Sequence, residues 1–380
     1  MVAIDSYAGG DGRLSPLSTP SATRAVLEAH GIGTKYTLGQ NFLVNDDVLK
    51  KIIALAEVGE DDRILEVGPG IGTLTIALLK HAAGVVAIER DPDLPAVLAD
   101  TLHPWREKFA LIEKDALDVT RDDIVAAMVE IGGDTGYPDR ASSAANETAQ
   151  WAVSQSEECL SESGYPASPP QEDLQLSLPS KLVANLPYAV AATVVLDYFE
   201  NFPFLDSATI MVQKEVADRM VAAVGTKNYG AYTVKLGLYV EPVGRFAVGP
   251  GNFFPPPRVD SAVIRLNRRV PLMADDAPAS PEVIAAAALM ADAAFTNRRK
   301  TIANSCKTYF SGRGPILLGV ADSSAAEGAP TIALPDGAAT AERLPAIFEA
   351  AAIDPRRRGE TLTQQEFLAL GAALLKVTAA

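Results

Sequence analysis

Apolar residues recur along the chain with two alternating spacings. From Asn45 onward, Val48, Leu49, Ile52, Ile53 and Ala56 follow the spacing of a helix with one buried face. Short apolar runs then alternate with further segments of helical spacing. They predict strands at 63–67, 85–88, 111–114, 182–184 and 209–212, and helices at 73–79, 93–102, 190–200 and 215–223. Strands alternating with helices indicate an α/β fold with an open, mostly parallel sheet.

Two further apolar stretches, 231–239 and 261–266, are expected to close this domain, the second as an edge strand. A linker at 270–281 leads to helical spacing over 282–295 and again from residue 342. We therefore expect an α/β domain at 35–269 and a small all-helical C-terminal domain at 270–380.

Three segments lack such periodicity. Residues 1–34 are rich in Gly and Pro and predict a flexible leader with a short helix near Val26. Residues 121–180 carry two basic against eleven acidic residues in a stretch rich in Ser, Ala, Pro and Gly, which predicts a disordered insertion. A Gly-, Ala- and Pro-rich stretch at 312–340 predicts a flexible break in the C-terminal domain.

The formal net charge of −15, taken alone, argues against a nucleic-acid partner. The charge is unevenly distributed, however, because residues 211–310 carry thirteen Lys and Arg against eight Asp and Glu. A nucleic-acid-facing surface is therefore expected on this basic part, with the acidic insertion projecting away from it.

The composition also excludes several classes of protein. The 380 residues include two cysteines and three histidines, which form no Cys/His cluster and lie beside no serine or cysteine signature. We therefore expect no disulfide framework, no metal site and no hydrolase triad. No apolar run is long enough for a membrane span and the N-terminus lacks a secretory pattern, which indicates a cytoplasmic protein.

The most informative turn joins the first strand of the predicted sheet to its helix. Gly68, Gly70 and Gly72 alternate as Gly-x-Gly-x-Gly, a pattern that lets the backbone approach a ligand closely. A dinucleotide fingerprint would have glycine at position 73, where this chain has Thr, so the pattern favours S-adenosylmethionine over NAD. A tight turn with a purely structural role stays the alternative.

Acidic residues end the next two predicted strands. Glu89 stands 21 residues after Gly68, where a carboxylate can accept hydrogen bonds from both ribose hydroxyls of the cofactor. Asp115 would accept a hydrogen bond from the exocyclic amine of its adenine. Either carboxylate alone could be a solvated strand end, but their succession behind the glycine turn favours a Rossmann-like methyltransferase domain.

Asn185, Leu186, Pro187 and Tyr188 close the fourth strand. The amino group of a base is a poor nucleophile because its lone pair is delocalised into the ring. The Asn185 side-chain oxygen and the Leu186 carbonyl could each accept one N–H and aim the lone pair at a methyl sulfonium, while Pro187 stiffens the loop. Tyr188 would stack on the flipped base and stabilise it by ~1–3 kcal/mol. The alternative is a proline-containing turn with a packed Tyr.

Two loops could complete such a site. Asn41 and Leu43 belong to the loop Gly39–Leu43, which could fold over the cofactor, or could be only a loop with a packed Phe. Phe253 opens a proline-stiffened loop and could form the second face of a base clamp. Hydrophobic anchoring of that loop explains Phe253 equally well.

Basic residues supply candidates for contacts with a phosphate backbone. Arg258 lies in the proline-stiffened loop, and Arg298, Arg299 and Lys300 form a basic run that we place on a helix of the C-terminal domain. A solvated face is the ordinary explanation of such a run, but its place in the basic half favours a nucleic-acid contact.

Taken in order, these segments resemble the KsgA family of small-subunit ribosomal RNA adenine dimethyltransferases. The resemblance rests on the motifs KYTLGQNFLVN, ILEVGPGIGTLT, AIERD, KDALD, VANLPY, VQKEVADRM, NFFPPPRVDSAV and FTNRRKTIANS. They cover about residues 35–310. The leader, the acidic insertion and the break after Phe310 depart from the family without replacing a motif residue.

The resemblance implies transfer of two methyl groups from S-adenosylmethionine to N6 of each of two adjacent adenines in a hairpin loop near the 3′ end of small-subunit rRNA. The substrate would be a preribosomal 30S particle, and the protein would act as a monomer without a metal or a membrane. The implied cofactor residues are Asn41, Leu43, Gly68, Gly70, Glu89, Asp115 and Asn185. The implied base-binding residues are Asn185, Leu186, Pro187, Tyr188 and Phe253.

The sequence leaves three other functions open. A resistance-type methyltransferase would act on a large-subunit rRNA adenine, but the long helical C-terminal part and Leu186 favour the small-subunit enzyme. A DNA adenine or protein-glutamine methyltransferase would share the cofactor turn and have an Asn-Pro-Pro-Tyr-like loop. The chain could also act mainly as a ribosome-assembly factor whose binding matters more than its catalysis.

Overall fold

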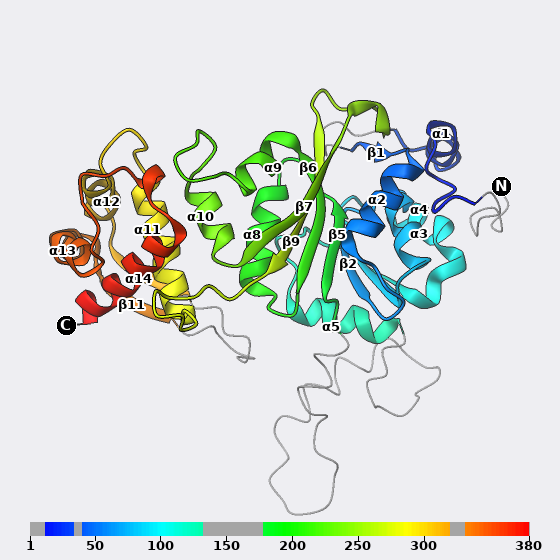
Figure 1. The fold of residues 1–380 in the computed structure, drawn as a ribbon. Coiled ribbons are helices and arrows are strands. Elements are labelled where there is room, and N and C mark those ends of the chain that lie inside the picture. Colours follow the sequence, from blue (N-terminus) through cyan, green and yellow to red (C-terminus); the bar gives the residue numbers. More distant parts are fainter. Residues whose placement is uncertain (1–11, 34–39, 132–177, 320–330, 380) are drawn as a thin grey trace, which may run out of the picture.

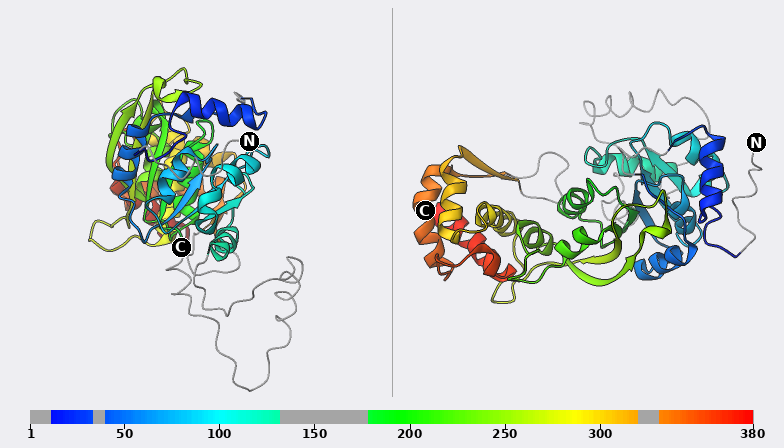
Figure 2. Two further views of the ribbon diagram at one scale, coloured as in Figure 1. Left: turned by 90° about the vertical axis from the view of Figure 1, so that its right-hand side faces the viewer. Right: turned by 90° about the horizontal axis from the view of Figure 1, so that it is seen from above.

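The computed structural model describes residues 12–33, 40–131, 178–319 and 331–379. They form an α/β domain and a smaller C-terminal domain that lie side by side (Figures 1 and 2). The strands are β1 (Phe42–Leu43), β2 (Arg63–Val67), β3 (Gly84–Ile88), β4 (Phe109–Ile112), β5 (Lys181–Asn185), β6 (Ser207–Gln213), β7 (Val240–Val248), β8 (Phe253–Phe254), β9 (Ser261–Arg268), β10 (Pro315–Gly319) and β11 (Thr331–Asp336). The α-helices are α1 (Pro20–Ala29), α2 (Asp46–Ala56), α3 (Thr73–Leu79), α4 (Pro95–Thr101), α5 (Arg121–Glu130), α8 (Ala191–Asn201), α9 (Lys214–Met220), α10 (Ala231–Gly237), α11 (Pro281–Phe295), α12 (Ile302–Ser311), α13 (Gly337–Ala350) and α14 (Gln364–Ala379).

The central sheet has seven strands in the order β4-β3-β2-β5-β6-β9-β7. The first five are parallel, and β9 and β7 are antiparallel to their neighbours, so the predicted Rossmann-like fold is confirmed. The prediction of an edge strand at 261–266 is wrong, because β9 pairs on both sides. The edge is β7, which sequence patterning missed because Pro242 and Gly244, where the pairing register shifts, look like turn residues.

The strands send alternate side chains to two separate cores. In β5, Leu182 and Ala184 face the core built with α5 and α8, whereas Val183 faces the core built with α2, α3 and α4. The same alternation places Ile210 and Met211 of β6 on opposite faces. Helices therefore cover both faces, as a mainly parallel sheet requires.

The leader is packed over its described part, which corrects the prediction of flexibility for residues 12–33. Leu17 is 1% exposed, and Val26 and Leu27 of α1 belong to the same core as β1. The short helix expected near Val26 is confirmed as α1. Residues 1–11 lie outside the described part of the chain.

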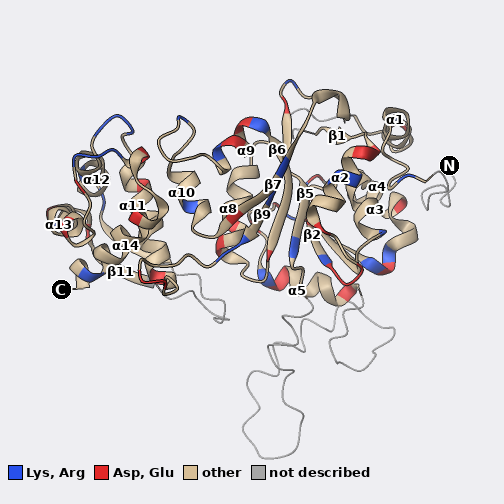
Figure 3. Ribbon diagram, viewed as in Figure 1, with Lys and Arg blue, Asp and Glu red and all other residues tan. Residues whose placement is uncertain are grey.

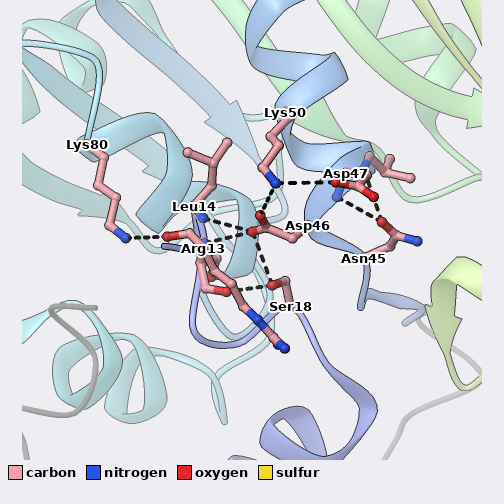
Figure 4. A network of polar contacts seen from close by, with 10 residues as sticks. Arg13, Leu14, Ser18, Asn45, Asp46, Asp47, Lys50 and Lys80 are labelled. Atoms are coloured by element: carbon pink, nitrogen blue, oxygen red, sulfur yellow. Dashed lines mark hydrogen bonds and ion pairs between the residues drawn. The ribbon is translucent and has the colours of Figure 1, made fainter. Parts of the chain in front are cut away.

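The carboxylate of Asp46, at the start of α2, holds this segment in place (Figure 4). Its Oδ1 accepts the backbone N–H groups of Leu14 and Ser15 at 2.9 and 3.2 Å. It also accepts the Ser18 hydroxyl at 3.3 Å, and the other oxygen lies 3.2 Å from Lys50 Nζ. A single side chain thus satisfies several polar groups of a segment that has little regular structure.

The prediction of disorder from residue 121 is wrong for the first part of the acidic segment. Residues 121–130 form α5, which starts with a capping box between Thr120 and Asp123 and buries Ile124. A high proportion of acidic residues therefore did not prevent this segment from folding, because its first-turn carboxylates favour a helix N-terminus. The remainder of the predicted insertion, residues 132–177, lies outside the described residues.

The C-terminal domain is built around α11, α12, α13 and α14, which share one core with Tyr229 and Val234 of the first domain. It is not all-helical, because β10 and β11 pair as an antiparallel two-stranded sheet within the stretch predicted as a flexible break. Residues 320–330 between them lie outside the described part. The basic run at 298–300 occupies the turn between α11 and α12 rather than a helix.

Candidate functional site

The carboxyl ends of the parallel strands surround one pocket, beside the point where the strand order reverses between β2 and β5. Open α/β sheets bind ligands at such a point because the loops diverge to opposite faces there. All residues predicted to hold the cofactor line this pocket: Asn41, Leu43, Gly68, Gly70, Glu89, Asp115 and Asn185. Leu186, Pro187 and Tyr188 line it as well.

The glycine turn brings backbone close to other walls of the pocket. Gly68 and Gly70 have φ angles of 71° and 62°, which side-chain-bearing residues rarely adopt. A Cβ on Gly68 would lie 3.5 Å from Pro187, and one on Gly70 would lie 3.2 Å from the Phe42 ring. A side chain at either position would therefore strain the backbone of the turn, and one at Gly70 would also crowd the Phe42 ring at the pocket.

Glu66, to which the sequence analysis assigned no role, lies at the base of the pocket. Its side chain is 1% exposed, and its Oε2 has no hydrogen-bond partner among the described residues. Burial, together with the charge of Glu89, raises the Glu66 pKa to about 8. An unpartnered buried carboxyl oxygen is costly, which suggests that a ligand supplies its partner. A charged residue inside the buried strand β2 is unusual, and this signal in the sequence could have identified Glu66 as a site residue.

Glu89 directly follows β3, as predicted, whereas β4 ends at Ile112, before the predicted end at 114, so Asp115 lies in the loop three residues beyond the strand. Glu89 Oε1 accepts the backbone N–H groups of Arg90 and Asp91, both at 2.9 Å, while burial raises the pKa of its carboxyl. Asp115 Oδ1 accepts the N–H of Leu117 at 3.1 Å, and Oδ2 lies 2.9 Å from Arg90 Nη1. These two contacts lower the Asp115 pKa. The two carboxylates thus stand fixed on one wall of the pocket.

The Asn185–Tyr188 loop is held at the pocket rim by three hydrogen bonds. Asn185 Nδ2 donates to the Asn41 carbonyl at 3.2 Å, which leaves the side-chain oxygen available as an acceptor. The backbone N–H of Leu186 donates to Met211 at 3.1 Å. The Tyr188 hydroxyl lies 2.6 Å from Ser261 Oγ, which fixes the plane of the ring.

Phe253 does not lie in the pocket. It is 4% exposed and pairs with Leu43 across the two-stranded β1–β8 sheet. In this conformation it anchors the proline-rich loop, so the alternative explanation given by the sequence holds and the expected clamp face is not presented. Phe254, the next residue, packs against Arg24 of α1, whose guanidinium carbon lies 5.2 Å from the ring centroid.

The basic candidates divide into two kinds. Arg258, Arg299 and Lys300 are exposed. Arg298 is ion-paired, because its Nε lies 3.0 Å from Glu360 Oε2 and its Nη2 donates to the Thr226 carbonyl at 3.0 Å. It therefore links the α11–α12 turn to loops of both domains.

A second basic loop, missed in the sequence, adjoins this turn. The backbone N–H of Ile302 donates to Arg357 at 2.7 Å, which brings the exposed side chains of Arg356 and Arg358 next to the run at 298–300. Figure 3 shows the two blue loops together above α12, on the side toward which the parallel strands point. Their separation by more than 50 residues in sequence hid the cluster.

The pocket suits a nucleoside cofactor with an amino-acid part. Close backbone approach, two carboxylates on one wall and an unpartnered buried carboxyl oxygen are the features that such a molecule needs. Among the described residues no group of three or more His, Cys, Asp or Glu side chains could hold a metal ion. Within the same part of the chain no helix is long and apolar enough to cross a membrane.

Comparisons with known proteins also indicate a methyltransferase. Residues 33–329 match the family model described as ribosomal RNA adenine dimethylase. A ribosomal RNA small subunit methyltransferase A of Geobacillus sp. (strain WCH70) is 32% identical over 363 residues, covering 95% of this chain and 98% of the relative. The protein of the same name from Staphylococcus aureus (strain Newman) is 32% identical, covering 93% and 94%.

Solved structures share the fold. A dimethyladenosine transferase from Plasmodium falciparum superposes with a TM-score of 0.55 at 19% identity, covering 88% of this chain and 98% of that one. The 23S rRNA methyltransferase ErmE superposes with a TM-score of 0.50 at 20% identity, covering 88% and 99%. At such identities these likenesses support the architecture, not the choice of substrate.

Proposed function

Because the chain belongs to the ribosomal RNA adenine dimethylase family, we propose that it dimethylates N6 of two adjacent adenines in a hairpin loop near the 3′ end of small-subunit rRNA. S-adenosylmethionine is the methyl donor. The observation that carries the proposal is the position of the Asn185–Tyr188 loop, which lines the same pocket as the glycine turn and the two carboxylates. Cofactor and target amine can therefore meet without rearrangement of the sheet.

The cofactor side of the site follows from the hydrogen-bonding capacity that each residue has left. Glu89 would bind the ribose hydroxyls and Asp115 the adenine amine, since each carboxylate has lone pairs beyond its present contacts. Glu66 would face the ammonium group of the amino-acid part, because a cation favours the ionised form of a buried acid. When bound, the cofactor supplies an electrophilic methyl group on a sulfonium.

The residues around the target amine would activate it by positioning alone. Asn185 Oδ1 and the Leu186 carbonyl would each accept one N–H of the target amine, which localises the nitrogen lone pair and directs it at the methyl group. Tyr188 would stack on the flipped base, its plane held by Ser261. Correct placement of two reacting groups removes much of a transfer barrier, so no metal or strong base is needed.

The basic loops suit a large, anionic substrate. Arg258, Arg299 and Lys300 are exposed and would contact RNA phosphates, joined by Arg358. Arg356 is exposed as well, but its guanidinium is paired with Asp354 at 2.9 Å. The spread of the basic residues over both domains favours a folded particle over a short RNA, so we take a preribosomal 30S particle as substrate. We expect a cytoplasmic monomer, as the small-subunit assignment implies.

The test is incubation with labelled S-adenosylmethionine and undermethylated small subunits, with large subunits in parallel, followed by nucleoside analysis. N6,N6-dimethyladenosine in the small subunit is the expected product. Label only in the large subunit would assign the chain to the resistance-type enzymes instead.

An Asn185→Ala variant separates catalysis from binding. It should still bind S-adenosylhomocysteine, though more weakly than wild type because Asn185 also lines the cofactor pocket. At saturating cofactor it should lose at least ~100-fold in methyl transfer, because one acceptor of the target amine is gone. If the variant still restores small-subunit assembly in cells while methylating nothing, a role mainly in assembly is favoured over one in catalysis.

A further inference from the structure

Arg90 joins the two carboxylates that the proposed function assigns to the cofactor. Its backbone N–H donates to Glu89 Oε1 at 2.9 Å, and its guanidinium Nη1 lies 2.9 Å from Asp115 Oδ2. Both Arg90 and Asp115 line the pocket. No other described cation pairs with Asp115, because the neighbouring Lys114 is engaged with Asp123.

The fold does not require an arginine at this position. The Arg90 side chain is 46% exposed and its partner 35% exposed, and ion pairs with this degree of exposure contribute little to stability. The hydrophobic cores beneath it are formed by other residues. A role in binding the ligand therefore explains the permanently charged guanidinium on the pocket wall better than a role in stability does.

The pair changes which hydrogen bonds the wall can make. Asp115 Oδ1 is oriented by the Leu117 N–H and Oδ2 by Arg90, so the carboxylate is fixed with a lone pair remaining on each oxygen. The contact engages one N–H of Arg90 Nη1 and so directs this edge of the guanidinium at Asp115. The wall thus offers acceptors to a purine 6-amino group and repels a 6-oxo group, which carries only lone pairs.

We propose that Arg90 is a positioning residue that orients Asp115, and that the Arg90–Asp115 pair makes the cofactor pocket selective for a 6-aminopurine over a 6-oxopurine. The inference rests on the proposed function, since it concerns the adenine part of the same cofactor. It goes beyond that function by assigning the selectivity to a side chain with no part in methyl transfer. Loss of Arg90 removes the contact that orients Asp115 Oδ2, so the carboxylate can turn away from the position that meets the amino group.

The experiment measures equilibrium binding of S-adenosylhomocysteine and of S-inosylhomocysteine, its 6-oxo counterpart, by calorimetry. Wild type is expected to prefer the amino compound by at least tenfold. Arg90→Leu should bind S-adenosylhomocysteine three- to tenfold more weakly and show a preference reduced by threefold or more. Arg90→Lys, which keeps the charge but not the planar fork, should fall between the two.

Arg106→Leu is the matched control, because Arg106 is an exposed arginine paired with Glu107 outside the pocket. It should leave both affinities unchanged, and thermal melting of each variant checks that it is folded. Equal weakening of both ligands in Arg90→Leu, or no change in either, would overturn the inference. If wild type binds neither ligand, the cofactor assignment itself fails and the inference falls with it.

Discussion

Substitution of Glu66 by Gln should make the protein more stable at neutral and alkaline pH while weakening its cofactor site. The carboxyl group is buried against the pocket without a partner for Oε2, and its pKa is raised to about 8 from an ordinary value of 4.5. The unfolded chain releases this proton near pH 4.5 and the folded chain only near pH 8. Between these values the folded state binds more protons, so Glu66 reduces stability as the pH rises.

The size of the effect follows from the shift. Each pKa unit corresponds to 1.36 kcal/mol, so ionisation of Glu66 costs about 3 kcal/mol of stability between pH 5 and pH 8. Gln fills the same space and cannot ionise. The difference in melting temperature between Glu66→Gln and wild type should therefore grow over this range, by roughly 6–12 °C at about 2–4 °C per kcal/mol.

The assay is thermal unfolding of both proteins from pH 5 to pH 8.5, with Glu113→Gln as the control for the same change at an exposed position. Melting curves of Glu66→Gln and wild type that stay parallel across pH would refute the reasoning. S-adenosylhomocysteine should raise the melting temperature of wild type more than that of Glu66→Gln, because the ligand's ammonium stabilises the ionised acid.

Three other predictions concern the leader, the basic turn and the base-binding loop. Asp46→Ala should lower the free energy of unfolding by about 2–4 kcal/mol in denaturant titrations, because it leaves the backbone N–H groups of Leu14 and Ser15 without an acceptor. The control Asp47→Ala, at an exposed position, should change it by less than ~1 kcal/mol. Arg299→Ala should reduce the slope of log affinity against log salt for small subunits by about one. Arg298→Ala should instead lower the melting temperature, because it breaks the ion pair with Glu360. A stability loss in Arg299→Ala and a reduced salt slope in Arg298→Ala would contradict these roles. Tyr188→Phe should keep most of the activity and Tyr188→Ala should lose at least ~10-fold in kcat/KM, since stacking needs the ring and not the hydroxyl; equal losses would contradict a stacking role.

The sequence was sufficient to predict a site residue wherever one short segment determines both the local structure and the residues that face the ligand. The Gly68–Gly72 turn, Glu89 and the loop from Asn185 lie where the spacing placed them, because each begins at the end of a buried strand, and Asp115 lies only three residues beyond β4. Parallel strands then bring these ends together without any further information.

The sequence was insufficient wherever a role depends on a distant partner. Leu17 looked like part of a flexible leader because its burial depends on Asp46 binding the segment around it. Arg298 looked like a free cation because Glu360, its partner, lies 62 residues away. Phe253 could not be assigned to core or surface, since a single aromatic residue in a short loop has no periodicity to reveal its environment.

The acidic net charge and a nucleic-acid substrate are compatible because the described residues on either side of the acidic segment lie at the end of the sheet opposite to the pocket. The described residues that flank the acidic segment are Ile131 and Leu178. Ile131 packs close to Gly84 at the amino end of β3, and Leu178 precedes the amino end of β5. The pocket lies at the carboxyl end, about 16 Å further along a five-residue strand. The Debye length is ~8–10 Å at physiological salt, so charges that lie farther than this from the site add little to its potential. Binding of an anionic substrate therefore depends on local charge, and the formal net charge of the chain is a poor guide to it.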